Sequence, residues 1–211
     1  VRGDFHNIYG TQIAPALTAK YNITMDMVLR ANVGKGYRTP YFFTDNISSF
    51  VNGRPIQIEQ NLNAEEAINY GLSYTIKSKI ARRNFTLNAD LYQTQFQNQI
   101  IVDQETNSSL VSVSNLDGQS ITTSALLSTT YEVISDLTLK LAYKWNHIEY
   151  DQAEVRINKM LIPKNRALMA LHYTTPNKKW EFSNTTTWIG QQDYLERQLI
   201  DNQVVQTRKT A

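Results

Sequence analysis

The chain has 211 residues, with 21 basic and 19 acidic side chains, no cysteine and a formal net charge of +2. The absence of cysteine excludes disulfides, zinc–thiolate sites and cysteine nucleophiles, and the interspersed charges form no basic stripe for nucleic acid. The mean hydropathy is −0.42, and no run approaches the roughly 18 apolar residues that a membrane-spanning helix needs.

Alternation of apolar and polar residues with a period of two runs through the whole chain and predicts β-strands. In chain order, the alternating segments are Thr11–Asn22, Met27–Val33, Ile68–Ile80, Phe85–Leu91, Ile121–Val133, Leu137–Trp145, Arg166–Thr174 and Trp180–Gly190, with partial strands expected at each end. Several segments exceed the five or six residues of an average soluble strand. A tilted strand that crosses a membrane needs about nine to eleven residues, so these lengths favour a membrane barrel.

The connections between these segments alternate in length. Tight turns are expected near Asn22–Asp26, Lys79–Arg83, Val133–Asp136 and Thr175–Lys179, and long polar connections at Tyr37–Ala67, Gln97–Gly118 and Ile148–Lys164. Short turns at one end and long loops at the other are typical of outer-membrane barrels. Within the first long connection, the sequence Asn63-Ala64-Glu65-Glu66 resembles a capping box and predicts one helical turn.

Aromatic residues on the apolar faces lie near strand ends, as in the aromatic girdles of membrane barrels. They are Tyr70, Tyr74, Tyr131, Tyr143, Trp145, Tyr173 and Trp180. The predicted fold class is therefore all-β, an antiparallel up-and-down meander of about 8–10 long strands. Two alternatives remain open: a small closed outer-membrane barrel, and a soluble β-sandwich binding module whose apolar faces meet in a dry core.

Residues that could carry chemistry are sparse. His6, His147 and His172 are far apart, and none has a carboxylate or a second histidine at ligand spacing. The acidic pair Glu65 and Glu66 is expected to be solvated surface charge. Neither a phosphate-binding loop nor a dinucleotide-binding glycine pattern occurs. We therefore predict no catalytic residue, no metal site, no cofactor and no enzymatic activity.

The stretch Leu29–Pro40 reads as an arginine-containing strand followed by Gly-x-Gly-aromatic-Arg-x-Pro, with Gly34, Gly36, Arg38 and Pro40 as its structural motif residues. Further motifs occur in chain order at Pro15-Ala16-Leu17, Leu62-Asn63-Ala64-Glu65, Asp90-Leu91-Tyr92, Phe96-Gln97-Asn98-Gln99, Asn115-Leu116-Asp117-Gly118, Leu161-Ile162-Pro163-Lys164-Asn165-Arg166 and Trp188-Ile189-Gly190. The stretch and the order of these motifs resemble TonB-dependent outer-membrane receptors. The resemblance covers nearly the whole chain.

The resemblance implies that residues 1–211 are a late fragment of an outer-membrane barrel of about 22 strands. The whole receptor would contain a plug domain that this chain lacks, receive energy from TonB through a missing N-terminal part, and lie among lipid and lipopolysaccharide in the outer membrane of a Gram-negative bacterium. It would import a scarce nutrient, such as an iron siderophore, haem, vitamin B12 or a glycan. The chain shows no TonB box and no terminal aromatic residue, so transport is not expected of it alone.

Nutrient contact is expected on the three long loops. Tyr41, Phe42 and Phe43 could stack on a ring-bearing ligand, and Arg54 could bind an anionic one. Packing of these side chains within their own loop is the alternative interpretation. Close strand packing or a bulge is the expected reason for the glycines of the motif, and Pro40 is expected to end its strand because proline has no N–H to donate.

Overall fold

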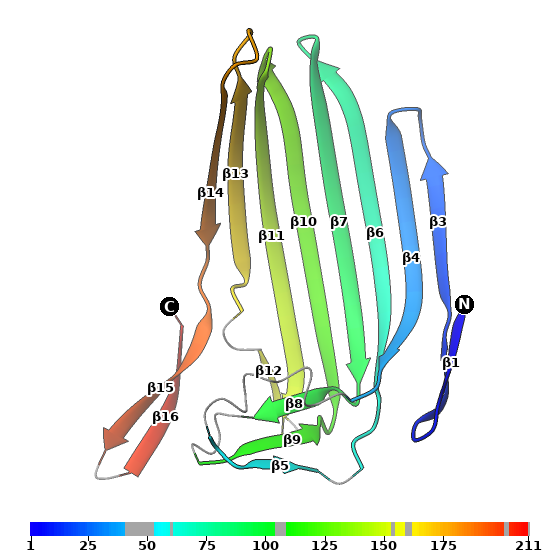
Figure 1. Ribbon diagram of the computed structural model, residues 1–211, viewed down its shortest axis with the longest axis vertical. Coiled ribbons are helices and arrows are strands. Elements are labelled where there is room, and N and C mark those ends of the chain that lie inside the picture. The colour runs from blue at the N-terminus through cyan, green and yellow to red at the C-terminus, as the bar shows by residue number, and fades with distance from the viewer. Residues whose placement is uncertain are drawn as a thin grey trace.

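The structure, a computed structural model, describes residues 1–40, 53–59, 61–103, 109–152, 155–158, 162–200 and 203–210. Every regular element in these ranges is a β-strand (Figure 1). The described residues hold no helix that could cross a membrane. The predicted all-β fold class is confirmed.

A nine-stranded antiparallel sheet forms the body of the molecule (Figure 1). Its strands, in chain order, are β3 (Ala16–Asn22), β4 (Met27–Arg38), β6 (Glu65–Ile80), β7 (Arg83–Gln97), β10 (Gln119–Ile134), β11 (Leu137–Gln152), β13 (Asn165–Thr174) and β14 (Glu181–Ile189), with the short β12 (Val155–Asn158) paired to β11. Each long strand pairs with the next one along the chain, as an up-and-down meander requires. The longest strands have 16 residues, far beyond the soluble average.

The register divides the main sheet into an apolar and a polar face, because directly paired residues in an antiparallel sheet point to the same side. One apolar row joins Leu29, Tyr74, Ala89, Leu127, Tyr143, Ala167 and Trp188 through successive cross-strand pairs. The neighbouring row along the strands begins with Arg30, Ser73 and Asp90 and faces the opposite side. The two periodic faces that the sequence predicts are thus the two faces of one continuous sheet.

No second layer covers the apolar face of the described sheet. Leu127 and Leu141 are 52% and 41% exposed, and Leu87 and Leu139 are only partly buried. The sandwich alternative predicts these leucines in a dry core, so it is wrong for the part of the chain that the structure describes. The two edge strands, β3 and β14, do not pair with each other there, so the sheet is not a small closed barrel either.

All four expected tight turns lie at one end of the sheet, which we call the turn end, at the top of Figure 1. A two-residue turn joins β6 to β7 through Ala81 and Arg82, whose φ angles are 49° and 65°. This is the turn geometry whose twist matches a two-residue hairpin, although glycine or asparagine usually supplies it. Asp136 adopts a φ of 66° in the turn between β10 and β11.

Pro15 divides the first predicted strand in two. The segment Thr11–Asn22 was expected to be continuous, but β2 (Gly10–Ala14) pairs with β1 (Arg2–His6) in a separate hairpin, and β3 begins only at Ala16. Proline lacks the N–H that a ladder needs. Its carbonyl oxygen still accepts a hydrogen bond from the Lys35 N–H at 2.9 Å, which holds the break beside β4.

The long connections lie at the opposite end, the loop end, and they contain strands that the sequence did not predict (Figure 1). They carry β5 (Ile56–Ile58), β8 (Ile100–Asp103) and β9 (Val111–Asn115). The predicted loop Ile148–Lys164 starts too early, because β11 continues to Gln152 and pairs there with β12. The predicted helical turn at residues 63–66 is also wrong, since Glu65 is the first residue of β6. A further hairpin, β15 (Asp193–Ile200) with β16 (Gln203–Thr210), follows β14.

Candidate functional site

Strands β5, β8 and β9 form a small sheet at the loop end, which we call the loop sheet (Figure 1). β8 and β9 pair antiparallel within the connection between β7 and β10. β5, from the connection between β4 and β6, adds to β9 in parallel. This parallel pair departs from the antiparallel pattern of the rest of the chain, and it joins two connections that are distant in sequence into one folded unit.

The enclosed apolar residues of the described chain lie on β9, directly after it, and directly before β6. Val111 and Val113 are 0% and 1% exposed, and Leu116 and Ala64 are 9% and 8% exposed. Val111 and Val113 are two residues apart on β9, so both side chains point to the same face of the strand, and that face is covered. This local hydrophobic cluster helps to hold the joined connections together.

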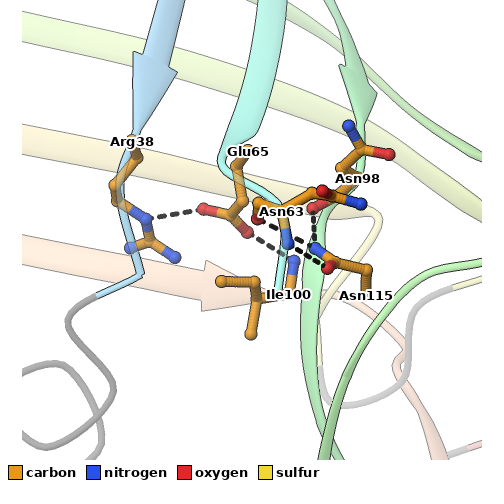
Figure 2. A network of polar contacts seen from close by, with 6 residues as sticks. All are labelled: Arg38, Asn63, Glu65, Asn98, Ile100 and Asn115. Atoms are coloured by element: carbon orange, nitrogen blue, oxygen red, sulfur yellow. Dashed lines mark hydrogen bonds and ion pairs between the residues drawn. The ribbon is translucent and has the colours of Figure 1, made fainter. Parts of the chain in front are cut away.

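Glu65 lies beside this cluster and joins three chain segments (Figure 2). Its residue exposure is 8%. One carboxylate oxygen, Oε2, accepts a hydrogen bond from Arg38 Nε at 2.6 Å, and the other, Oε1, accepts one from the Ile100 N–H at 2.6 Å. A buried carboxylate needs such compensation for lost hydration, so Glu65 fixes the end of β4 and the start of β8 to β6.

Asn115, the last residue of β9, ties the residues before β6 and after β7 to the loop sheet (Figure 2). Its Oδ1 accepts from the Asn63 N–H at 2.7 Å, and its Nδ2 donates to the carbonyl oxygens of Asn63 and Asn98 at 3.2 and 2.6 Å. Asn98 has a φ of 53°, a left-handed conformation that asparagine tolerates better than most residues. We call Arg38, Glu65, Ile100, Asn63, Asn98 and Asn115 together the rim network.

The expectation that Glu65 and Glu66 are both solvated is wrong for Glu65. Strand β6 starts at Glu65, three residues before the predicted start at Ile68, and successive side chains there point to opposite faces. Glu66 pairs with Lys35 at 2.8 Å, with the two side chains 30% and 36% exposed. The difference follows from the pairing of Arg38 with Glu65 across β4 and β6, which the strand register reveals and the sequence pattern does not.

The predicted nutrient-contact residues are only partly within the described chain. Tyr41, Phe42 and Phe43 lie outside the described residues. Arg54 lies two residues before β5 and is partly buried. Contact of the four residues with a ligand stays a prediction.

The four motif residues all lie at the loop end of β4. Arg38 is its last residue, and Pro40 follows it. Gly34 pairs with Ala16, and a Cβ added at Gly34 would lie 3.3 Å from the Ala16 Cβ, so close strand packing accounts for this glycine. A Cβ at Gly36 would have no atom within 4 Å, and close packing gives no reason for glycine there.

His147 has a carboxylate partner, contrary to expectation. Its Nε2 lies 2.8 Å from Glu149 Oε1, because residues two apart on a strand share a face. The His147 ring also stacks on Trp145, with centroids 5.8 Å apart and planes 4° from parallel. The described residues contain no group of three potential metal ligands.

The first hairpin is joined to β4 by a polar contact. The Tyr37 hydroxyl donates to the Asp4 carboxylate, and the Arg2 guanidinium pairs with the same carboxylate at 2.6 Å. The hydrogen bond from Tyr37, followed by that from Arg2, holds the pKa of Asp4 below its ordinary value. The contact therefore favours the charged form of the carboxyl group.

Comparison with known proteins gives one family and a consistent fold. The family model for the TonB dependent receptor-like β-barrel matches residues 1–209. No curated protein matches the chain by sequence.

Three solved structures illustrate the shared fold. The FrpB iron transporter of Neisseria meningitidis is 13% identical with a TM-score of 0.64, over 87% of this chain and 28% of its own. The ferric enterobactin receptor of Pseudomonas aeruginosa is 14% identical with a TM-score of 0.64, over 90% and 30%. The siderophore receptor PirA of Acinetobacter baumannii is 13% identical with a TM-score of 0.67, also over 90% and 30%. The chain thus spans less than a third of the length of these structures.

Proposed function

The chain belongs to the TonB-dependent receptors, as part of their β-barrel, and from this premise we propose that it forms part of the wall of a transporter that imports a scarce nutrient across the outer membrane of a Gram-negative bacterium. The family consists of receptors and transporters, and we assign no catalytic step and no cofactor to this chain. Residues 1–211 then act as a partial barrel domain, with the plug domain and the segment that contacts TonB elsewhere in the same protein.

The observation that carries this proposal is the uncovered apolar face of the main sheet. Leu72, Leu91, Leu127 and Leu141 are 45%, 49%, 52% and 41% exposed, on one face of strands up to 16 residues long. Water is a poor solvent for so broad an apolar surface. A bilayer covers it without a second protein layer, while the polar face lines a lumen.

Details of the same face support contact with lipid. Near the turn end, Phe85 and Tyr131 pack edge to face at 6.4 Å, and Tyr173 stacks on Phe182 at 6.5 Å, as interfacial aromatic residues do. Midway along the strands lies an open apolar hollow of about 420 Å³. Leu87, Leu127, Leu141, Met169 and Trp188 are among its lining residues, and acyl chains of lipid or lipopolysaccharide would fill it.

The loop end then faces the outside of the cell, and the nutrient meets the loops there first. Because the rim network and the loop sheet hold two connections as one unit, they present a fixed surface on which a ligand could dock. Tyr41, Phe42, Phe43 and Arg54 belong to the connection between β4 and β6 and are the proposed contact residues. The solved structures of similar fold are an iron transporter and siderophore receptors, so we place iron siderophores before haem, vitamin B12 and glycans.

Uptake by cells that produce the full-length protein tests the proposal. Iron-starved cells with the gene, without it, and with the gene but without TonB are given labelled siderophores, haem, cobalamin and oligosaccharides. We expect one class of nutrient to accumulate only when both the gene and TonB are present. The proposal would be contradicted if uptake of all these nutrients were the same with and without the gene. Fractionation of the protein away from the outer membrane would also contradict it.

A further inference from the structure

One row of the polar face contains a charge pattern that the proposed function does not explain. Successive cross-strand pairs place Lys20, Arg30, Ser73, Asp90, Leu126, Lys144 and Arg166 side by side across the main sheet. Lys20 on β3 is directly opposite Arg30 on β4, and Lys144 on β11 is directly opposite Arg166 on β13. The row therefore carries two cationic pairs, one near each edge of the sheet.

Each pair is unfavourable by itself. Like charges directly opposite in an antiparallel sheet have Cβ atoms about 4.5–5.5 Å apart and destabilise the pairing. All four cationic side chains are exposed. Within the described residues none of the four takes part in the ion pairs that the structure contains, which involve Arg2, Lys35, Arg38, Arg83 and His147.

The carboxylate in the same row cannot neutralise them. Asp90 lies on β7, two strand spacings from Arg30 and two from Lys144, which at about 4.8 Å per spacing is roughly 10 Å on either side. The rows nearer the loop end on this face carry no charge in mid-sheet, where Asn32, Gly71, Tyr92, Ser124 and Asn146 follow one another. Two rows nearer the turn end, Lys77 and Lys140 share a row of the same face but lie on separate, non-adjacent strands. Among the described pairs of the main sheet, the row from Lys20 to Arg166 is therefore the one in which cations lie directly opposite each other, and we call it the cationic band.

We infer that this band is an interaction surface for an acidic protein surface inside the barrel lumen, one that places carboxylates opposite Lys20–Arg30 and opposite Lys144–Arg166. The inference rests on the proposed function, in which the polar face lines a lumen. The two cationic pairs are four strand spacings apart, about 19 Å. A small anionic solute could contact one pair but could not span both, whereas a folded surface with several carboxylates could neutralise both at once.

The cost of leaving the band uncompensated supports the same partner. If a protein domain covered these four cations with apolar or basic side chains, their lost hydration would oppose the packing. Carboxylates restore the lost interaction as charge-assisted hydrogen bonds. The surface that covers this wall is therefore acidic at two separate places, and Asp90 between them fits a neutral or basic group on the partner.

Carbodiimide treatment of the full-length receptor in detergent tests the inference, because it joins a lysine amine to a carboxylate only when the two are in contact. We expect cross-links by mass spectrometry from both Lys20 and Lys144 to aspartate or glutamate residues outside residues 1–211. We also expect both lysines to be acetylated at least tenfold more slowly than Lys178, which is exposed in the turn between β13 and β14. Acetylation as fast as that of Lys178, cross-links to Asp90 alone, or no cross-link would overturn the inference.

Paired variants distinguish a failure of this inference from a failure of the proposed transport function. Lys144→Glu with Arg166→Glu should lower the midpoint of thermal unfolding of the full-length receptor, and charge-conserving Lys144→Arg with Arg166→Lys should not. Nutrient uptake is measured on the same preparations. A receptor that imports its nutrient while Lys20 and Lys144 remain open to acetylation refutes the acidic surface alone, and a receptor with the cross-links but no import refutes the transport function alone.

Discussion

Substitution of Glu65 should release the loop sheet from the barrel rim. In Glu65→Ala, the Ile100 N–H loses its acceptor at 2.6 Å and Arg38 loses its partner at 2.6 Å. A hydrogen bond to a charged group contributes about 1.5–3 kcal/mol. The ion pair adds at most about 1 kcal/mol, because the Arg38 side chain is 57% exposed. The sum predicts that local opening becomes easier by about 2–4 kcal/mol.

Hydrogen exchange measures this opening directly. The Ile100 amide exchanges only when the rim network opens, so Glu65→Ala in the full-length protein should accelerate it roughly 30- to 700-fold. Glu65→Gln keeps one oxygen that can accept from Ile100 but loses the charge that Arg38 pairs with. We expect a smaller cost of about 1–2 kcal/mol and an acceleration of roughly 5- to 30-fold.

Glu66→Gln is the matched control for this experiment. Glu66 is the next residue and also forms an ion pair, with Lys35 at 2.8 Å, but it makes no hydrogen bond with Ile100. Its partly exposed pair is worth about 0–1 kcal/mol, and exchange at Ile100 should stay within about twofold of the parent. The reasoning is refuted if Glu65→Ala leaves exchange at residues 98–103 unchanged, or if Glu66→Gln accelerates it as much.

Three other substitutions test other parts of the structure. Leu127→Arg places a cation in the apolar belt and should lower the free energy of unfolding by about 2–4 kcal/mol, measured by urea unfolding from lipid vesicles. Ser128→Arg on the polar face should lower it little. Equal losses of stability would contradict the assignment of the two faces. A Cβ at Gly71 would lie 1.9 Å from Asn32 Oδ1 and 2.5 Å from Tyr92 Cε1, so Gly71→Ala should destabilise the receptor by about 1–3 kcal/mol, with partial rescue by Tyr92→Ala, and an unchanged thermal midpoint would argue against this contact. The pKa of Asp4 lies below its ordinary value. The contribution of Asp4 to holding the first hairpin on β4 is therefore complete above the ordinary carboxyl pKa of about 3.9, and it is lost as the pH falls through the lower folded-state pKa. Tyr37→Phe should return the pKa of Asp4, measured by carboxyl NMR, toward that ordinary value, and an unchanged pKa would show that Tyr37 is not the cause.

Local patterns were sufficient for the main sheet because its strands depend on nearest neighbours. A period of two specifies which side of a strand is apolar and which is polar, and a one-residue slip would exchange them. Leu139 and Leu141 therefore lie on the expected face, and the turn between β10 and β11 occurs where the alternation is interrupted. The family resemblance was also readable from sequence, because the motif residues Gly34 to Pro40 lie close together in the chain, at the end of β4 and just after it.

The sequence did not reveal the rim network or the cationic band, because both depend on pairs far apart in the chain. Glu65 and Ile100 are 35 residues apart, and Asn115 and Asn63 are 52 apart. Whether Glu65 is buried, and whether Lys144 is opposite Arg166, is decided by strand register and by the parallel addition of β5 to β9. Periodicity thus determined the two faces of this wall, whereas tertiary pairing decided which charges meet, because an ion pair depends on distance in space and the pattern records only position along the chain.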